Sequence, residues 1–86
     1  MTLKQQAELE LVQIESISVL TEFAAYERGE LSGKKVLQKI GDLLTLIRSV
    51  QLSLHDYKTE YDQLESLAQR WIRNSAKIKV AQAEMR

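Results

Sequence analysis

Few side chains of this 86-residue chain have both the type and the spacing that chemistry requires. His55 is the single histidine, and a histidine that acts as a general base needs a nucleophile or an orienting carboxylate close by. Asp56 is its sequence neighbour, so on a helix the two side chains would point in different directions. The pattern favours His55 as a loop or capping residue. We therefore predict no catalytic residue and no enzymatic activity.

Metal ions and cofactors find no recognisable ligand set in the sequence. The chain has no cysteine, which excludes disulfides and thiolate metal sites, and no pair of carboxylates shows a recognised ligand spacing with His55. Residues 29–33 contain two glycines and precede Lys34 and Lys35, but they lack the Gly-Lys-Ser/Thr ending of a phosphate loop. We predict no metal site and no cofactor, and we interpret residues 29–33 as a turn between helices.

The elements that would position any site are helices. Proline is absent and only three glycines occur, so strong helix breakers are nearly missing. Gly29 suits the left-handed position that ends a helix, and Ser32 is a good N-cap for the next helix. After this turn, apolar residues recur at alternating steps of four and three, which is typical of one helix face. The residues of this apolar seam are Val36, Ile40, Leu43, Ile47, Val50, Leu54, Tyr57, Tyr61, Leu64, Ala68, Trp71 and, after a polar interruption at Ser75, Ile78. The predicted fold class is all-α.

Two architectures are compatible with this seam. Ser53 and Asp56 offer capping chemistry, which predicts a single domain over residues 1–86, an antiparallel three-helix bundle with helices at about 3–28, 33–53 and 56–82. Alternatively the seam belongs to one unbroken helix about 75 Å long, in a two-helix hairpin that would have to dimerise as a coiled coil or four-helix bundle. We favour the bundle, because its helices are close to the usual lengths.

The first predicted helix is apolar over more of its girth than a small monomer can bury. Its apolar residues form three neighbouring stripes: Val12, Val19, Phe23 and Tyr26; Leu9, Ile17, Leu20 and Ala24; Leu3, Ala7, Leu11 and Ile14. The remaining polar stripe is narrow and mostly acidic, and residues 1–31 carry a net charge of −4 against +4 for residues 32–86. Such a helix is either central in a bundle or covered by another chain, so we predict a protein partner and consider a homodimer.

The remaining patterns favour ordinary structural roles. Tyr57, Tyr61 and Trp71 lie on the seam and are interpreted as core residues, although Tyr61 and Trp71 are also candidate contact anchors. A basic segment closes the chain, but no helix-turn-helix signature or stacking platform accompanies it, so nucleic-acid binding is not predicted. The bases of this segment are Arg70, Arg73, Lys77, Lys79 and Arg86. The absence of a long apolar run predicts a cytoplasmic protein without a membrane segment.

The order of these features resembles the epsilon-type antitoxins, small three-helix partners of zeta toxin kinases. An acidic, apolar first helix precedes a turn with Glu30-Leu31-Ser32, and a Leu-rich second helix, shorter by about a turn, follows. Asp56-Tyr57 and a third helix with Leu64 and Trp71-Ile72-Arg73 complete the likeness, which covers most of the chain through short motifs separated by gaps. The resemblance implies an inhibitor that neutralises a P-loop kinase acting on a UDP-amino sugar, by blocking its nucleotide site with the N-terminal helix.

A nucleotide site attracts anions, so an acidic helix is physically compatible with this role. The predicted partner-binding residues are three acids, which would face the electropositive cleft, and two aromatics, which would supply buried area: Glu8, Glu15, Glu22, Phe23 and Tyr26. The alternative function is a self-assembling helical scaffold or a secretion-type adaptor or chaperone.

Overall fold

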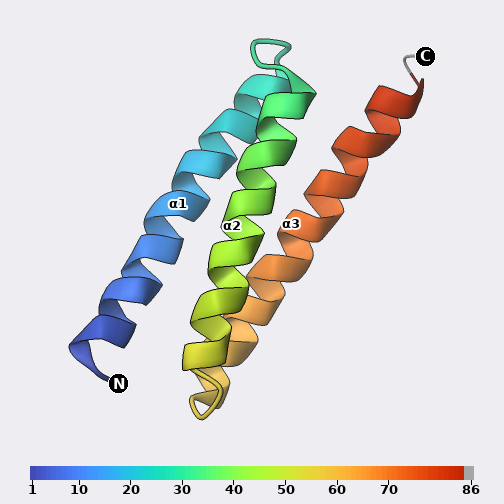
Figure 1. Cartoon of the computed structure of the whole chain (residues 1–86). Helices are drawn as coiled ribbons and strands as arrows, with labels where there is room; N and C mark the ends of the chain where they lie inside the picture. Colours follow the sequence, from blue (N-terminus) through green and yellow to red (C-terminus); the bar gives the residue numbers. More distant parts are fainter. Residues whose placement is uncertain (85–86) are drawn as a thin grey trace.

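The chain folds as three α-helices in a computed structural model that describes residues 1–84 (Figure 1). The helices are α1 (Leu3–Glu27), α2 (Gly33–Ser53) and α3 (Lys58–Glu84). The predicted all-α three-helix bundle is confirmed, and α3 begins and ends two residues later than predicted. Because α2 ends at Ser53, the alternative of one unbroken helix running past Tyr57 is wrong. Arg86 of the basic segment lies outside the described residues.

Side-chain caps and one glycine determine where α1 and α2 begin and end. Thr2 Oγ1 accepts a hydrogen bond from the Gln5 backbone N–H at 3.1 Å, and Gln5 Oε1 accepts one from the Thr2 N–H at 2.9 Å. Ser32 Oγ accepts from the Lys35 N–H at 3.3 Å, so the predicted N-cap of α2 is confirmed. Gly29 has φ +78°, a left-handed conformation that favours glycine, and the turn that the sequence predicted at residues 29–33 occupies residues 28–32, since Gly33 already belongs to α2.

The turn between α2 and α3 occupies residues 54–57 and differs in detail from the prediction. The Tyr57 N–H donates to the Leu54 carbonyl at 2.9 Å, and the Tyr57 carbonyl then accepts from the Tyr61 N–H at 2.9 Å. Tyr57 therefore occupies the position just before α3. Asp56 does not serve as the cap that was expected, and its Oδ1 lies 3.3 Å from His55 Nε2.

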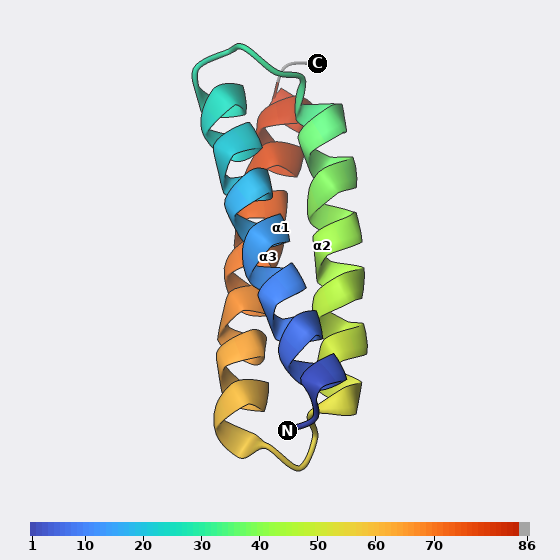
Figure 2. The same cartoon turned by 90° about the vertical axis from the view of Figure 1, so that its left-hand side faces the viewer.

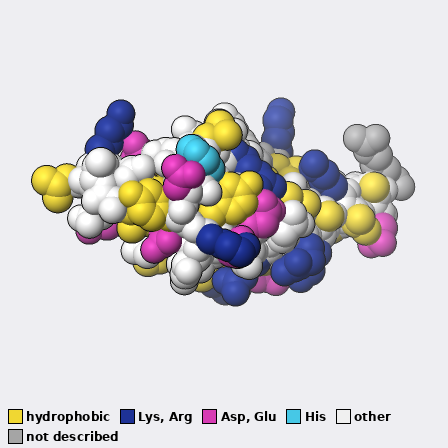
Figure 3. Space-filling model, turned by 90° about the horizontal axis from the view of Figure 1, so that it is seen from below, with side chains coloured by type: hydrophobic (Ala, Val, Ile, Leu, Met, Phe, Trp, Pro, Cys, Tyr) yellow, Lys and Arg dark blue, Asp and Glu magenta, His cyan; other side chains and the backbone are white. Residues whose placement is uncertain are grey.

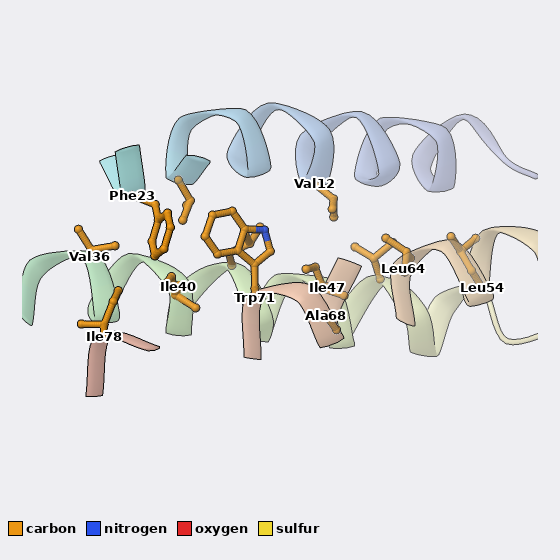
Figure 4. Close-up of a cluster of buried hydrophobic side chains, with 13 residues drawn as sticks. Val12, Phe23, Val36, Ile40, Ile47, Leu54, Leu64, Ala68, Trp71 and Ile78 are labelled. Carbon is orange, nitrogen blue, oxygen red and sulfur yellow. The ribbon is translucent and has the colours of Figure 1, made fainter. Parts of the chain in front are cut away.

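The core lies on the seam that the sequence predicted (Figure 4). Its buried members from α2, the turn and α3 are Val36, Ile40, Leu43, Ile47, Val50, Leu54, Leu64, Ala68, Trp71 and Ile78. From α1 only Val12, Val19 and Phe23 join them. Tyr57 and Tyr61, which the seam also placed in the core, are each 36% exposed because they lie where the bundle ends.

Helix α2 contacts both of its neighbours, whereas α1 and α3 stay apart. Both α1 and α3 run antiparallel to α2, and so parallel to one another (Figures 1 and 2). Within the three helices as described, no Cα atom of α1 lies within 8 Å of a Cα atom of α3. Side chains fill part of the gap: the rings of Phe23 and Trp71 meet edge to face, with centroids 6.0 Å apart and planes at 85°.

A polar cluster joins α2 to α3, and we call Arg48, Gln51 and Glu65 the α2–α3 clamp. Arg48 Nη1 donates to Gln51 Oε1 and to Glu65 Oε1, each at 2.8 Å. Gln51 is buried, and its Nε2 donates to the Tyr61 carbonyl at 3.2 Å. The hydrogen bonds from Arg48 and then Gln69 lower the pKa of Glu65 from 4.5 to about 2. The clamp thus fixes the register of α3 on α2.

Candidate protein-binding surface

Helix α1 exposes a row of large apolar side chains on the face that points away from the core. We call this row the α1 outer stripe; each member is at least 44% exposed, and its members are Leu3, Leu11, Ile14, Ile17 and Leu20. Two positions along a helix correspond to a rotation of about 200°, so Ile14 points away from the buried Val12. Ile17 is opposed to the buried Val19 in the same way. Helix α1 is therefore apolar on two opposite faces, and the bundle covers only one of them.

A groove continues this stripe toward α3, as expected where two helices are held apart. It consists of two adjoining hollows of about 120 and 190 Å³ that share Leu67, and we call them together the α1–α3 groove. The first hollow is lined by Leu9, Val12, Gln13, Glu60, Gln63, Leu64 and Leu67, and the second by Ser16, Ile17, Leu20, Leu67, Arg70 and Trp71. Ile17 and Leu20 are members of the α1 outer stripe and also line the second hollow, so the stripe and the groove form one surface.

The three acids predicted to bind a partner lie seven residues apart along α1. This spacing places Glu8, Glu15 and Glu22 along one edge of the helix, between its buried face and its outer face. Glu15 is exposed, whereas Glu8 and Glu22 are half-buried. One oxygen of Glu22, Oε2, is buried and has no hydrogen-bond partner among residues 1–84. Of the three, Glu15 is the exposed one.

Of the two predicted aromatic contacts, Phe23 is part of this protein's own interior and Tyr26 is half-buried. Phe23 is 9% exposed and packs against Trp71. Tyr26 is half-buried, 6.1 Å from Phe23 between ring centroids, and helps to line a hollow beside the turn at Gly33. The prediction that Phe23 offers contact area to a partner is corrected by this burial. The apolar area that a partner can reach is the α1 outer stripe, whose members were noted in the sequence but were not predicted as contacts.

The side chains that could act as a general base or as metal ligands do not come together in one site. His55 Nδ1 lies 3.1 Å from the Leu52 carbonyl, and the His55 side chain is exposed on the turn. Asp56 is the carboxylate in contact with it, and both side chains are largely solvated. Within the described part of the chain, no group of three metal-ligating side chains comes together. His55 is placed where the sequence predicted, in a loop.

Hydrophobic side chains also gather at the end of the bundle that carries the α2–α3 turn. Leu52 is 78% exposed there, and Tyr57 and Tyr61 lie near it in the chain. Figure 3 looks at this end and shows hydrophobic side chains on the surface around the single histidine. We call Leu52, Tyr57 and Tyr61 the turn patch; the two tyrosines are each 36% exposed, less than any member of the α1 outer stripe.

The described bases of the C-terminal segment lie on α3 and are all exposed: Arg70, Arg73, Lys77 and Lys79. Arg73 and Lys77 flank a shallow apolar hollow with Val80 on the outside of α3. Arg70 differs from the others, because it stands at the α1–α3 groove beside Ile17 and Leu20. Among the C-terminal bases, Arg70 is therefore the closest to the α1 outer stripe.

Comparisons of this chain with protein-family models, with curated proteins and with solved structures gave no match. None of the three helices, as described, has the length and apolar character needed to span a bilayer.

Proposed function

We propose that this protein is a non-enzymatic inhibitor that binds another protein through the α1 outer stripe. The observation that carries this proposal is the exposure of five large apolar side chains over the half of α1 that faces away from the core, with Ile14 and Ile17 near its middle. Contiguous exposed apolar surface of this kind marks interaction sites on small proteins. The bundle buries its core without these residues, so they are free to serve recognition.

Charge supports a basic partner surface. Glu15 is exposed at the edge of the stripe, and Glu8 lies about two helical turns before it on the same edge. Residues 1–31 carry a net charge of −4. An acidic rim around an apolar stripe attracts a partner of opposite sign and accelerates the encounter. It also disfavours acidic competitors, so that charge contributes to the choice of partner.

At a finer level, we propose an antitoxin that works in the cytoplasm against a toxin kinase, as the resemblance to epsilon-type antitoxins implies. Three helices with an acidic first helix are compatible with that role. The contacts differ from those expected at first, since Phe23 is internal. The side chains that would cover the nucleotide site are Leu11 and Ile14, with Glu15, one turn after Leu11 on the neighbouring edge, directed at its cationic groups.

The proposal is tested with a photo-crosslinking residue placed at Ile17 or, as the matched control, at Leu52, both in the native host. Leu52 is also apolar and is exposed to 78%, against 66% for Ile17, but it lies on the turn patch. Position 17 is expected to crosslink to one other protein and position 52 not to do so. If that protein is a P-loop kinase, adding the purified chain should raise its apparent KM for ATP. Crosslinks from position 17 to this chain alone would contradict the proposal.

A further inference from the structure

We infer that in the free protein a second copy of the same chain covers the α1 outer stripe. Two copies pair α1 against α1 in antiparallel orientation, about a twofold axis that passes close to Ile14. This inference concerns the isolated protein and does not rest on the proposed partner. Three features of the surface carry it: the apolar residues, and two pairs of opposite charges that share the same centre of symmetry.

The apolar residues are self-complementary about Ile14. In an antiparallel pair centred on residue 14, position 14 meets its own copy, and position 11 lies opposite position 17 of the second copy. Ile14 would thus contact Ile14, and Leu11 would contact Ile17 twice, once on each side of the axis. All three are exposed in the single chain. The smaller Ala7 and Thr21 follow in the same register and allow the helices to approach.

The first pair of charges is Glu10 and Arg70. Glu10 lies within the exposed face of α1, Arg70 stands at the groove beside Ile17 and Leu20, and neither forms an ion pair within residues 1–84. Around a twofold axis at residue 14, Glu10 is level with position 18 of the second copy. Position 18 lies between Ile17 and Leu20, the two residues that Arg70 stands beside, so the geometry brings Glu10 close to the Arg70 of the second copy, twice per dimer.

The second pair of charges is Lys4 and Glu22, which lie toward opposite ends of α1. Both are on the edge of the helix that also carries Glu8 and Glu15, and neither has an ion-pair partner in the described chain. A twofold axis brings equivalent edges to the same side, so Lys4 approaches Glu22 of the second copy when the centre is at residue 13. The two charge pairs thus require the same centre to within one residue.

The size of this interface predicts a weak dimer. A helix of 25 residues is about 37 Å long, so a stripe about 10 Å wide covers roughly 370 Å² of each copy. A stable interface buries about 800 Å² of each partner, so residues beside the α1–α3 groove must supply the remaining area. Glu8 and Glu15 of the two copies also lie on the same side and repel one another. A second copy would therefore cover the stripe reversibly, and a basic partner would displace it.

Sedimentation equilibrium of the full chain, from about 1 μM to about 1 mM, tests the inference over the range of Kd expected for a small interface. Wild type should pass from monomer to dimer within this range. Ile14→Lys should weaken the dimer at least about thirtyfold with an unchanged melting temperature, since position 14 is exposed in the monomer. Leu52→Lys, outside the stripe, is the matched control and should leave the dimer unchanged.

A charge swap tests the antiparallel geometry itself. Glu10→Arg and Arg70→Glu should each weaken the dimer about tenfold, and the double variant should restore it to within about threefold of wild type. Wild type that is monomeric at about 1 mM, a dimer insensitive to Ile14→Lys, or a double variant no better than the single ones would overturn the inference. None of these results bears on whether Ile17 crosslinks to a different protein in the host, so the proposed function stands or fails separately.

Discussion

The two helix pairs of this bundle are built differently. Between α2 and α3, the buried Gln51 and the ion pair of Arg48 with Glu65 tie the helices together. Between α1 and its neighbours, the polar links among the described residues all come from Gln5 Nε2, which donates to the Ser53 carbonyl at 3.0 Å and to Ser53 Oγ at 3.5 Å. The outer faces of α2 and α3 expose only scattered large apolar side chains, such as Leu52, Ile72 and Val80, whereas α1 exposes five of them over the half of the helix that faces away from the core.

This difference separates stability from recognition within one small chain. Buried polar groups with satisfied hydrogen bonds fix the register of α2 and α3, because any shift would leave Gln51 unpaired. Helix α1 is held by its buried apolar residues and by the contact of Gln5 with Ser53 at one end. Its outer face therefore contributes no contacts that stabilise the bundle. Substitutions in the two regions are therefore expected to change different observables.

Removal of Trp71 should have the largest effect, because its ring joins all three helices. It is 1% exposed and packs against Phe23. Trp71→Ala should lower the free energy of unfolding by about 3–5 kcal/mol, measured by urea denaturation. Ile72→Ala on the exposed side of α3 is the control and should change it by less than about 0.5 kcal/mol. Similar losses in both variants would show that α3 is not packed as described.

Substitutions of two glycines of α2 are expected to have opposite effects. A Cβ atom on Gly33 would lie 3.0 Å from Ile78 Cγ2 and 3.3 Å from Tyr26 Cε2, so Gly33→Ala should destabilise the bundle by about 1–3 kcal/mol. Gly41 has open space around it, and Gly41→Ala should stabilise α2 by about 0.5–1 kcal/mol. Urea unfolding of both variants checks this, and a neutral Gly33→Ala would mean that the three chain segments there do not close together.

The α2–α3 clamp predicts a specific acid sensitivity. The pKa of Glu65 is lowered from 4.5 to about 2, chiefly by the hydrogen bond from Arg48. A carboxyl whose pKa is lower in the folded state stabilises the fold above its unfolded pKa, and this contribution is lost as the pH falls from about 4.5 toward 2. Glu65→Gln should slightly lower the melting temperature at neutral pH and remove this part of the acid dependence. Arg48→Met should do the same; acid unfolding identical to wild type in both would rule the clamp out.

Much of the fold follows from spacing and capping in the sequence. The alternating steps of the seam predicted α2, α3 and their buried face, and Gly29 with Ser32 predicted the first turn. The start of α3 was placed two residues early, because Asp56 has the chemistry of a cap but faces His55 instead. Local sequence preferences cannot decide between such competing contacts.

The candidate surface was predicted only in part, because it depends on how distant segments pack. Helical spacing put Phe23 on the stripe of Val12 and Val19, but its burial depends on Trp71, which is distant in the sequence. The α1–α3 groove likewise exists only because two helices far apart in the chain are held at a distance. A count of apolar residues revealed that α1 has too many to bury, but not which of them remain outside.

The inner face of α1 stabilises the bundle, whereas its outer face is available for binding. One substitution placed on each face tests this division. Val12 is 1% exposed and Ile14 is 62% exposed, two positions away. Urea unfolding of Val12→Lys and Ile14→Lys, at a concentration where the chain is monomeric, measures both. Val12→Lys should lose at least about 3 kcal/mol, whereas Ile14→Lys should stay within about 0.5 kcal/mol of wild type. Comparable losses in the two variants would contradict the account, because Ile14 would then belong to the core.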